Sequence, residues 1–195
     1  MSNIPDSVKS ASQNLMKSLR TVNEAHLANF SRKTVPEIEL VKHVRKELRE
    51  ILGQKNVFVT VKGLHEHFGE IVFLKQPDVD LCFRYSGKLY GVEFKLLGGR
   101  VSFYSGLEEA IAYSTYGIDY SWIVHFFRKS FKNAKNYERW MKYVIEQSNC
   151  LSVGYICSST KSSRVVVYPK QPFPRKSEPK LEEIVSKVRE KLFLK

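Results

Sequence analysis

The stretch that decides the fold is PDVDLCFRYSGKLYGVEFKLLGG, residues 77–99. Its apolar residues fall in two short segments on either side of Ser86–Gly87, a pair typical of a tight turn, so the sequence predicts a β-hairpin. Two acids fall in the first predicted strand, and an acid and a lysine in the second: Asp78, Asp80, Glu93 and Lys95. Charged side chains are rare in apolar strands unless something pairs with them. The hairpin therefore marks a candidate site.

The flanking sequence predicts an α/β fold in which a mixed central sheet has helices on both faces. Hydrophobic periodicity and turn residues predict strands at 56–63, 70–87, 88–97, 120–127, 151–159 and 163–169. The same signals predict helices at 6–31, 36–52, 102–117, 136–147 and 180–194. A helix between the strands 88–97 and 120–127 requires those two strands to be parallel.

The length of 195 residues suggests one core domain with terminal extensions. We expect a helical N-terminal extension at 1–34, a core at 35–170, and a linker with a C-terminal helix at 171–195. The apolar stripe of residues 6–31 is thin, so we expect it to serve a dimer or docking contact. One terminal helix should cover the core and the other should pair across a two-fold axis, giving a homodimer.

The composition favours a polyanionic partner. Lysine and arginine number 32 against 20 acids, a formal charge of +12, which suits nucleic acid, although solubility alone is the alternative. Cys82, Cys150 and Cys157 show no CxxC spacing, which argues against zinc, iron–sulfur and disulfide frameworks. A reducing cytoplasmic or other intracellular compartment fits this best. With no apolar run of spanning length and no signal peptide, we expect no membrane association.

The charged residues of the hairpin suggest a metal site. Side chains alternate along a strand, so Asp78 and Asp80 share a face, and so do Glu93 and Lys95. The turn places the strands side by side, and carboxylates so close together repel unless a cation lies between them. Mg²⁺, with Mn²⁺ as a substitute, takes one or two carboxylates and bridges to a phosphate. Lys95 beside it would orient water or stabilise a pentavalent phosphorane.

The motif PDVDL…GVEFK resembles the signature of the PD-(D/E)XK nuclease superfamily, which includes many restriction endonucleases and the archaeal Holliday junction resolvases. The resemblance covers about residues 35–127 and implies a restriction endonuclease-like fold and a Mg²⁺-dependent endodeoxyribonuclease. It assigns metal binding and water activation to Asp80, Glu93 and Lys95. Asp80 is preferred over Asp78 because it directly precedes the apolar strand residues, with Asp78 as a neighbour able to share the metal. A strand salt bridge between Asp80 and Lys95 is the alternative.

The same resemblance implies further catalytic residues on two helices. The family often adds a glutamate from the preceding helix, for which Glu37 is our first choice and Glu47 the second. Glu109 and Tyr113 resemble a Gln-x-x-x-Tyr element beside the metal site, with Glu in place of Gln. Exposed helical acids and an ordinary i, i+4 helix pair are the respective alternatives.

Two stretches are candidates for nucleic-acid contact. In LGGRVSFYSG, residues 97–106, Arg100 would lie near phosphate, and Phe103 or Tyr104 would stack on a base; a helix-entry loop with core aromatics is the alternative. In FFRKSFKNAK the backbone-contacting residues would be Arg128, Lys129 and Lys132. His65 and His67 are interpreted as polar turn residues, because the carboxylates already suit a hard ion.

The sequence therefore predicts a metal-dependent DNA endonuclease with no small-molecule cofactor. The flanks are too small for a separate recognition domain, which favours cleavage directed by DNA structure at a junction, a flap or a repair or replication intermediate. A restriction-type, sequence-specific nuclease remains an alternative within the same class. A non-catalytic nucleic-acid-binding protein on the same fold, and a structural or assembly protein, are the alternatives from other classes.

Overall fold

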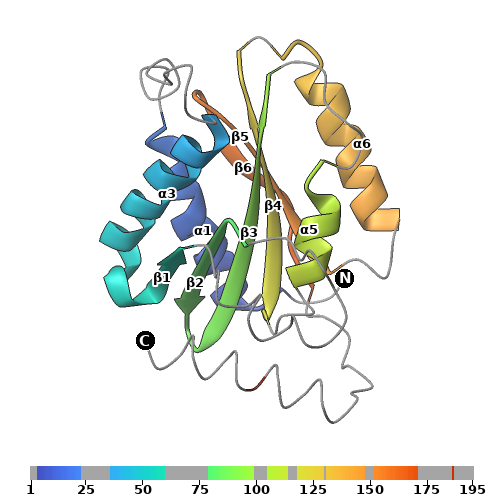
Figure 1. Cartoon of the computed structure of the whole chain (residues 1–195). Coiled ribbons are helices and arrows are strands. Elements are labelled where there is room, and N and C mark those ends of the chain that lie inside the picture. The colour runs from blue at the N-terminus through green and yellow to red at the C-terminus, as the bar shows by residue number, and fades with distance from the viewer. Residues whose placement is uncertain are drawn as a thin grey trace, which may run out of the picture.

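The computed structural model describes residues 4–22, 36–59, 79–98, 105–113, 118–129, 131–147 and 152–170, together with Ser186. Its helices are α1 (Asp6–Arg20), α3 (Pro36–Leu52), α5 (Leu107–Ala112) and α6 (Ala134–Gln147). Its strands are β1 (Val57–Val59), β2 (Leu81–Tyr85), β3 (Lys88–Leu97), β4 (Tyr120–Phe127), β5 (Val153–Ser159) and β6 (Ser163–Val167). The six strands form one sheet in sequential order from β1 to β6, with helices on both sides (Figure 1).

The sheet is mixed. Strands β1, β2 and β3 are joined as an antiparallel meander, and β6 returns antiparallel to β5. Strands β3, β4 and β5 are parallel, with α5 and α6 in the two connections between them. The predicted parallel pairing of 88–97 with 120–127 is confirmed, because β3 and β4 match in register from Tyr90↔Tyr120 to Leu97↔Phe127. The predicted α/β class is thus confirmed, with a six-stranded mixed sheet between helices.

The hairpin between β2 and β3 forms as predicted. Ser86 and Gly87 both have positive φ, at 48° and 70°, which is the backbone twist that a two-residue hairpin turn needs. The predicted strand 70–87 does not run through Asp80, which lies in a bend before β2, and residues 70–78 lie outside the described residues. Pairing with β2 begins at Leu81↔Val92, so β3 runs on for five residues beyond its last β2 partner.

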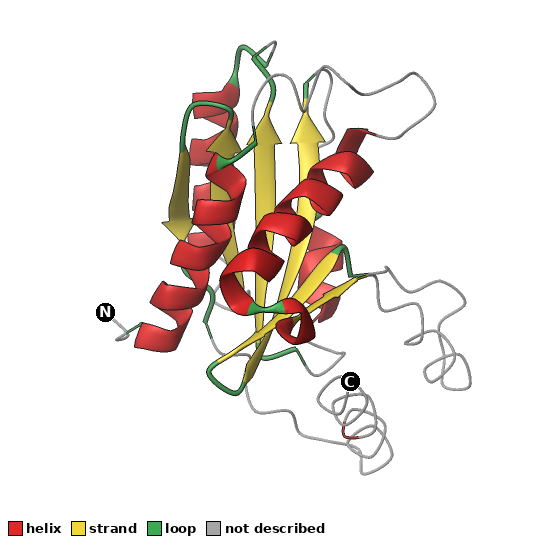
Figure 2. Ribbon diagram, turned by 90° about the vertical axis from the view of Figure 1, so that its left-hand side faces the viewer, coloured by secondary structure: helices red, strands yellow, loops and turns green. Residues whose placement is uncertain are grey.

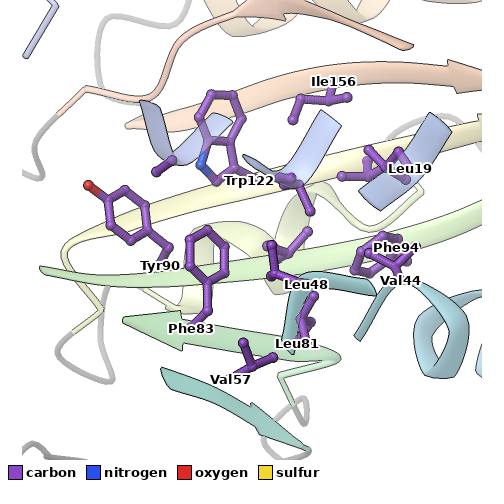
Figure 3. Close-up of a cluster of buried hydrophobic side chains, with 14 of the residues drawn as sticks. Leu19, Val44, Leu48, Val57, Leu81, Phe83, Tyr90, Phe94, Trp122 and Ile156 are labelled. Atoms are coloured by element: carbon purple, nitrogen blue, oxygen red, sulfur yellow. The ribbon is translucent and has the colours of Figure 1, made fainter. Parts of the chain in front are cut away.

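Each face of the sheet has its own layer of helices. Helices α1 and α3 cover one face, and α5 and α6 cover the other (Figures 1 and 2). Side chains of β3 alternate between them: Val92 and Phe94 are buried against α1 and α3, whereas Glu93 and Lys95 face α5. Figure 3 shows the apolar layer, to which α1, α3 and β1–β5 all contribute side chains.

Helix α1 belongs to the core of the domain. Val8, Leu15 and Leu19 are fully buried in the same cluster as the apolar side chains of α3 and the sheet. Of the two roles expected for the terminal helices, α1 therefore has the one that covers the core, and its stripe is buried against the sheet of the same chain. The predicted helix 6–31 ends at Arg20, and the rest of it, from 23 onward, lies outside the described residues.

Other expectations are met in part. Helix 36–52 and strand 120–127 have the predicted limits, and α6 starts two residues earlier than predicted. Of the C-terminal helix 180–194, only Ser186 is described. Cys82 and Cys157 are free buried thiols, and Cys150 is outside the described residues. In the described part of the chain, no helix is long and apolar enough to cross a membrane.

Candidate functional site

Side chains from four elements converge beside the second half of β3. Strand β3 supplies two of them, the bend before β2 one, the first turn of α3 one, and α5 with its C-terminal cap two. We call this group the β3 cluster; it consists of Glu93, Lys95, Asp80, Glu37, Glu109 and Tyr113. All six catalytic residues predicted from the sequence are thus brought together, although 76 positions separate the first from the last in the chain.

The open edge of β3 holds two of the acids. Beyond Val92, β3 has no β2 partner, so backbone N–H groups on that side need other acceptors. The Phe94 N–H donates to Oδ2 of Asp80 at 2.8 Å, and the Leu96 N–H donates to Oε2 of Glu37 at 3.1 Å. Carboxylates therefore replace the missing strand, which fixes two acids from distant parts of the sequence along one edge.

Lys95 lies among three glutamates. Its Nζ is 2.5 Å from Oε1 of Glu93, 3.4 Å from Oε1 of Glu109 and 3.7 Å from Oε1 of Glu37. Burial alone would lower the pKa of Lys95, but Glu93 and the other two glutamates outweigh it and raise that pKa above its ordinary value. The ammonium therefore stays charged. In the described residues its direct partners are these glutamates, whereas Asp80 binds the Phe94 backbone.

Tyr113 ties α5 to the strand acids. Its hydroxyl is fully buried and donates to Oε2 of Glu93. Burial, followed by Glu93 and Asp80, raises the pKa of Tyr113, and a hydrogen bond from the Asp80 backbone opposes that rise. One phenol thus contacts the carboxylate of Glu93 and the backbone of Asp80, and it keeps its proton.

The β3 cluster is short of positive charge. Four carboxylates around one ammonium carry a formal charge of −3 if all are ionised. Burial, then Asp80, raises the pKa of Glu93 to about 8 despite the opposing effects of Lys95 and Tyr113. Burial likewise raises the pKa of Asp80 to about 6, against a backbone hydrogen bond from Phe94. At neutral pH Glu93 therefore keeps its proton for most of the time, whereas most Asp80 carboxyls are ionised, so the cluster holds one buried acid that Lys95 does not keep charged.

The donor set suits a hard cation, although it is not closed around one. Among the described residues, no group of three or more His, Cys, Asp and Glu is arranged to hold a metal ion as it stands. The Lys95 ammonium lies between the glutamates instead. Mg²⁺ needs only one or two protein carboxylates and keeps several waters, so a closed cage is not required. Oε2 of Glu109 is buried without a hydrogen-bond partner in this part of the chain, which leaves one further oxygen to satisfy.

Other predicted site residues are placed apart from the cluster or not described. Arg128 follows β4, and its aliphatic stem lies against Gly98, while Lys129 and Lys132 are exposed. Glu47 lies ten residues beyond Glu37, about 15 Å further along α3, and no ion pair joins it to the β3 cluster among the described residues. The remaining candidates lie outside the described residues: Asp78, Arg100, Phe103, Tyr104, His65 and His67.

Sequence reasoning missed His125. This residue lies on β4 opposite Lys95 and is completely buried. Its Nε2 is 3.0 Å from the Ser105 carbonyl, just before α5, and its Nδ1 is 3.1 Å from the Tyr155 hydroxyl. The signal was present, because His125 interrupts the otherwise almost uniformly apolar strand YSWIVHFF.

Comparisons with models of protein families, with curated proteins and with solved structures found no match to this chain. The interpretation of the β3 cluster therefore depends on its own geometry.

Proposed function

We propose that this chain is a metal-dependent endonuclease that hydrolyses phosphodiester bonds in DNA, on a restriction endonuclease-like version of the mixed α/β sheet. The observation that carries the proposal is the meeting of Asp80, Glu93 and Lys95 beside the open end of one strand. Their order in the sequence, and the Glu-x-Lys spacing of the last two, resemble the PD-(D/E)XK motif. Glu37, Glu109 and Tyr113 then join them from the two helices that the resemblance implies.

In this proposal Asp80 and Glu93 would hold Mg²⁺, or Mn²⁺ in its place. The bound ion would lower the pKa of a water and offset charge that develops on phosphorus. The fit is supported by the burial that raises the pKa of both acids, because a bound cation would favour their ionised forms, and by Oε2 of Glu109, which has no hydrogen-bond partner among the described residues.

The protein's own groups would prepare the reacting geometry. Lys95, held charged by the glutamates, would hold its protons toward the scissile phosphate and orient the attacking water. Tyr113 would keep the Glu93 carboxylate in one orientation, because its hydroxyl already donates to Oε2. Glu37 would fix the start of α3 on β3, because its carboxylate accepts the Leu96 N–H. Preorganised charges of this kind supply much of the rate in phosphoryl transfer.

The test is DNA cleavage by the full chain with Mg²⁺ or Mn²⁺ on a panel of duplex, flap, single-stranded and four-way-junction substrates. We expect Asp80→Asn and Glu93→Gln each to slow cleavage by at least about 10²-fold, the scale for losing one electrostatic group in an active site. Binding to the same DNA, measured in Ca²⁺, should persist or tighten, because negative charge facing phosphate is removed.

Two exposed acids provide matched controls, Asp6→Asn and Glu50→Gln, which make the same chemical changes away from the β3 cluster. Both should cleave as the parent does. Equal activity of the parent and Asp80→Asn at saturating Mg²⁺ would refute the assignment. DNA binding with no cleavage under any metal would favour the non-catalytic nucleic-acid-binding alternative instead.

A homodimer is part of the same proposal, because two sites related by a two-fold axis could cut two strands. Since α1 is used within the domain, the predicted C-terminal helix at 180–194 is the segment to test. Sedimentation at micromolar concentration should give twice the chain mass of 22.6 kDa, and deletion of residues 171–195 should give the monomer. A full chain that sediments at the monomer mass would refute the dimer.

A further inference from the structure

A buried histidine lies behind the β3 cluster, and no step of the proposed chemistry uses it. His125 is fully buried on β4, next to Lys95 on β3 and beneath the start of α5. Figure 1 shows α5 lying against this part of the sheet, on the same face as α6. A buried polar ring in an apolar strand is costly unless its hydrogen bonds are made, and both nitrogens of His125 have partners.

The two partners fix the tautomer. A carbonyl oxygen only accepts, so Nε2 carries the hydrogen and donates to Ser105, and Nδ1 accepts from the Tyr155 hydroxyl. Burial lowers the pKa of His125 to about 4, and Lys95 adds to that effect against the bond to Ser105. The ring is therefore neutral, with one nitrogen committed to the chain that enters α5.

The turn that His125 holds is the one that sets α5 on the β3 cluster. Gly106 follows Ser105 with φ of 79°, and a Cβ there would lie 3.0 Å from both Glu93 Cγ and Lys95 Cε. The Gly106 carbonyl then accepts the Ala110 N–H at 3.1 Å as α5 begins. Burial raises the pKa of Tyr137, and a hydrogen bond with the Ser105 backbone partly offsets it, so Ser105 is held from two sides.

We propose that His125 is a positioning residue: by donating from Nε2 to the Ser105 carbonyl, it clamps the Ser105–Gly106 turn. The clamp so holds Glu109 of α5 against Lys95, and Tyr113, the C-terminal cap of α5, against Glu93. Helix α5 has only six residues, too few to be stable alone, so its placement depends on contacts such as this. The clamp acts through the backbone, and His125 itself touches no reacting group. Its consequence for catalysis rests on the proposed nuclease function, whereas its consequence for α5 does not.

The test uses two amide substitutions that separate the ring nitrogens. In His125→Gln the side-chain amide reaches about as far as Nε2 and can still donate to Ser105, whereas in His125→Asn it reaches only about as far as Nδ1. Amide hydrogen exchange of the full chain, without metal or DNA, reports the placement of α5. We expect the amides of Ala110–Tyr113 to exchange at least about tenfold faster in His125→Asn and to stay within about threefold of the parent in His125→Gln.

Tyr155→Phe is the matched control, because it removes the bond to Nδ1 in the same buried pocket and leaves the bond to Ser105. It should behave like His125→Gln, and amides of β4 and β5 should keep their protection in every variant. Equal loss of α5 protection in the Gln and Asn variants, or loss spread over β4 as well, would overturn the proposal by showing a packing role only. Protection of the α5 amides that is unchanged in His125→Asn, His125→Gln and Tyr155→Phe alike would also overturn the proposal.

Cleavage by the same proteins gives the second readout. If the chain is a nuclease, the single-turnover rate should fall about tenfold or more in His125→Asn and recover in His125→Gln, with DNA affinity in Ca²⁺ unchanged. If the variants show the expected exchange pattern but the parent cleaves no DNA, the proposed function would be refuted and the clamp would remain supported. A cleaving parent whose Asn variant keeps its full rate would refute the clamp's catalytic consequence.

Discussion

The two faces of the sheet are built from alternate residues of the same strands, yet they differ in chemistry. Toward α1 and α3, the buried side chains of β3 and β4 are apolar or aromatic, such as Tyr90, Phe94 and Trp122 (Figure 3). Toward α5, the neighbouring positions are Glu93, Lys95 and His125, all buried or nearly so. Burying apolar groups stabilises the fold, whereas burying ionisable groups opposes it unless they are fully compensated.

The apolar packing against α1 and α3 stabilises the domain, whereas the buried ionisable groups that face α5 lower its stability. The apolar face includes α1, α3 and five strands in one continuous cluster. Packing on that face can hold β3 rigid, although Glu93 and the neighbouring Asp80 are buried acids whose pKa values are raised to about 8 and about 6. Functional sites commonly carry such locally unfavourable groups, supported by stable packing elsewhere.

The largest effect on stability should come from a change on the apolar face. Phe94→Ala removes a fully buried ring and should lower the free energy of unfolding by about 3–5 kcal/mol. Urea unfolding measures it. The control is Ile111→Ala on the other face, where the side chain is 38% exposed and the loss should be below about 1 kcal/mol. Similar losses for both would contradict the dependence of the loss on the burial of each side chain.

Much of this division is visible in the sequence. Strict alternation in GVEFKLL identified Glu93 and Lys95 as sharing a face, and the turn at Ser86–Gly87 identified β2 as the strand that pairs with the first half of β3. Those local patterns were enough to locate the site. Glu37 and Glu109 could be proposed only by resemblance, because the distance between a helix side chain and a strand edge depends on tertiary packing.

The features that the sequence did not predict also depend on tertiary packing, which local patterns do not show. The thin stripe on α1 left open whether that helix covers its own core or pairs with a second chain, because amphipathicity shows that a face is covered without showing by what. Asp80 was placed inside a strand because periodicity does not show where ladder pairing stops. The open edge that results from that stop is what Asp80 and Glu37 fill.

The second prediction concerns the residue next to Phe94 on the opposite face. Glu93→Gln should stabilise the metal-free protein at pH 8, because a neutral amide avoids the burial and repulsion that raise the pKa of Glu93. Between its ordinary pKa of 4.5 and about 8, the unfolded chain releases a proton that the folded chain keeps. Rising pH therefore lowers the stability of the parent across that window, and this loss should be absent in the variant.

We expect the variant to gain on the order of 1–3 kcal/mol over the parent at pH 8 and little at pH 4, measured by urea unfolding in EDTA. His125, whose pKa is lowered to about 4, gives both proteins a slope of opposite sign at acid pH, which cancels in the difference. Mg²⁺ should then stabilise the parent and not the variant. A variant less stable than the parent at pH 8 would show that the Glu93–Lys95 pair outweighs the burial cost.

The smallest effect should come from the charge pair at the margin of the α5–α6 face. Arg164 of β6 donates from one guanidinium nitrogen to both oxygens of Glu138 on α6, at 2.7 and 2.5 Å. The geometry resembles that within the β3 cluster, but the Arg164 side chain is 63% exposed, so water and salt screen the pair. Arg164→Ala should therefore cost no more than about 1 kcal/mol, and most of that loss should disappear in 1 M salt. Urea unfolding at low and high salt measures both. The Arg164–Glu138 and Lys95–Glu93 contacts have similar lengths, so a small loss here would show that burial decides how much such a pair contributes to stability. A loss of several kcal/mol that persists in salt would instead indicate that water is excluded from the margin of this face as much as from its centre.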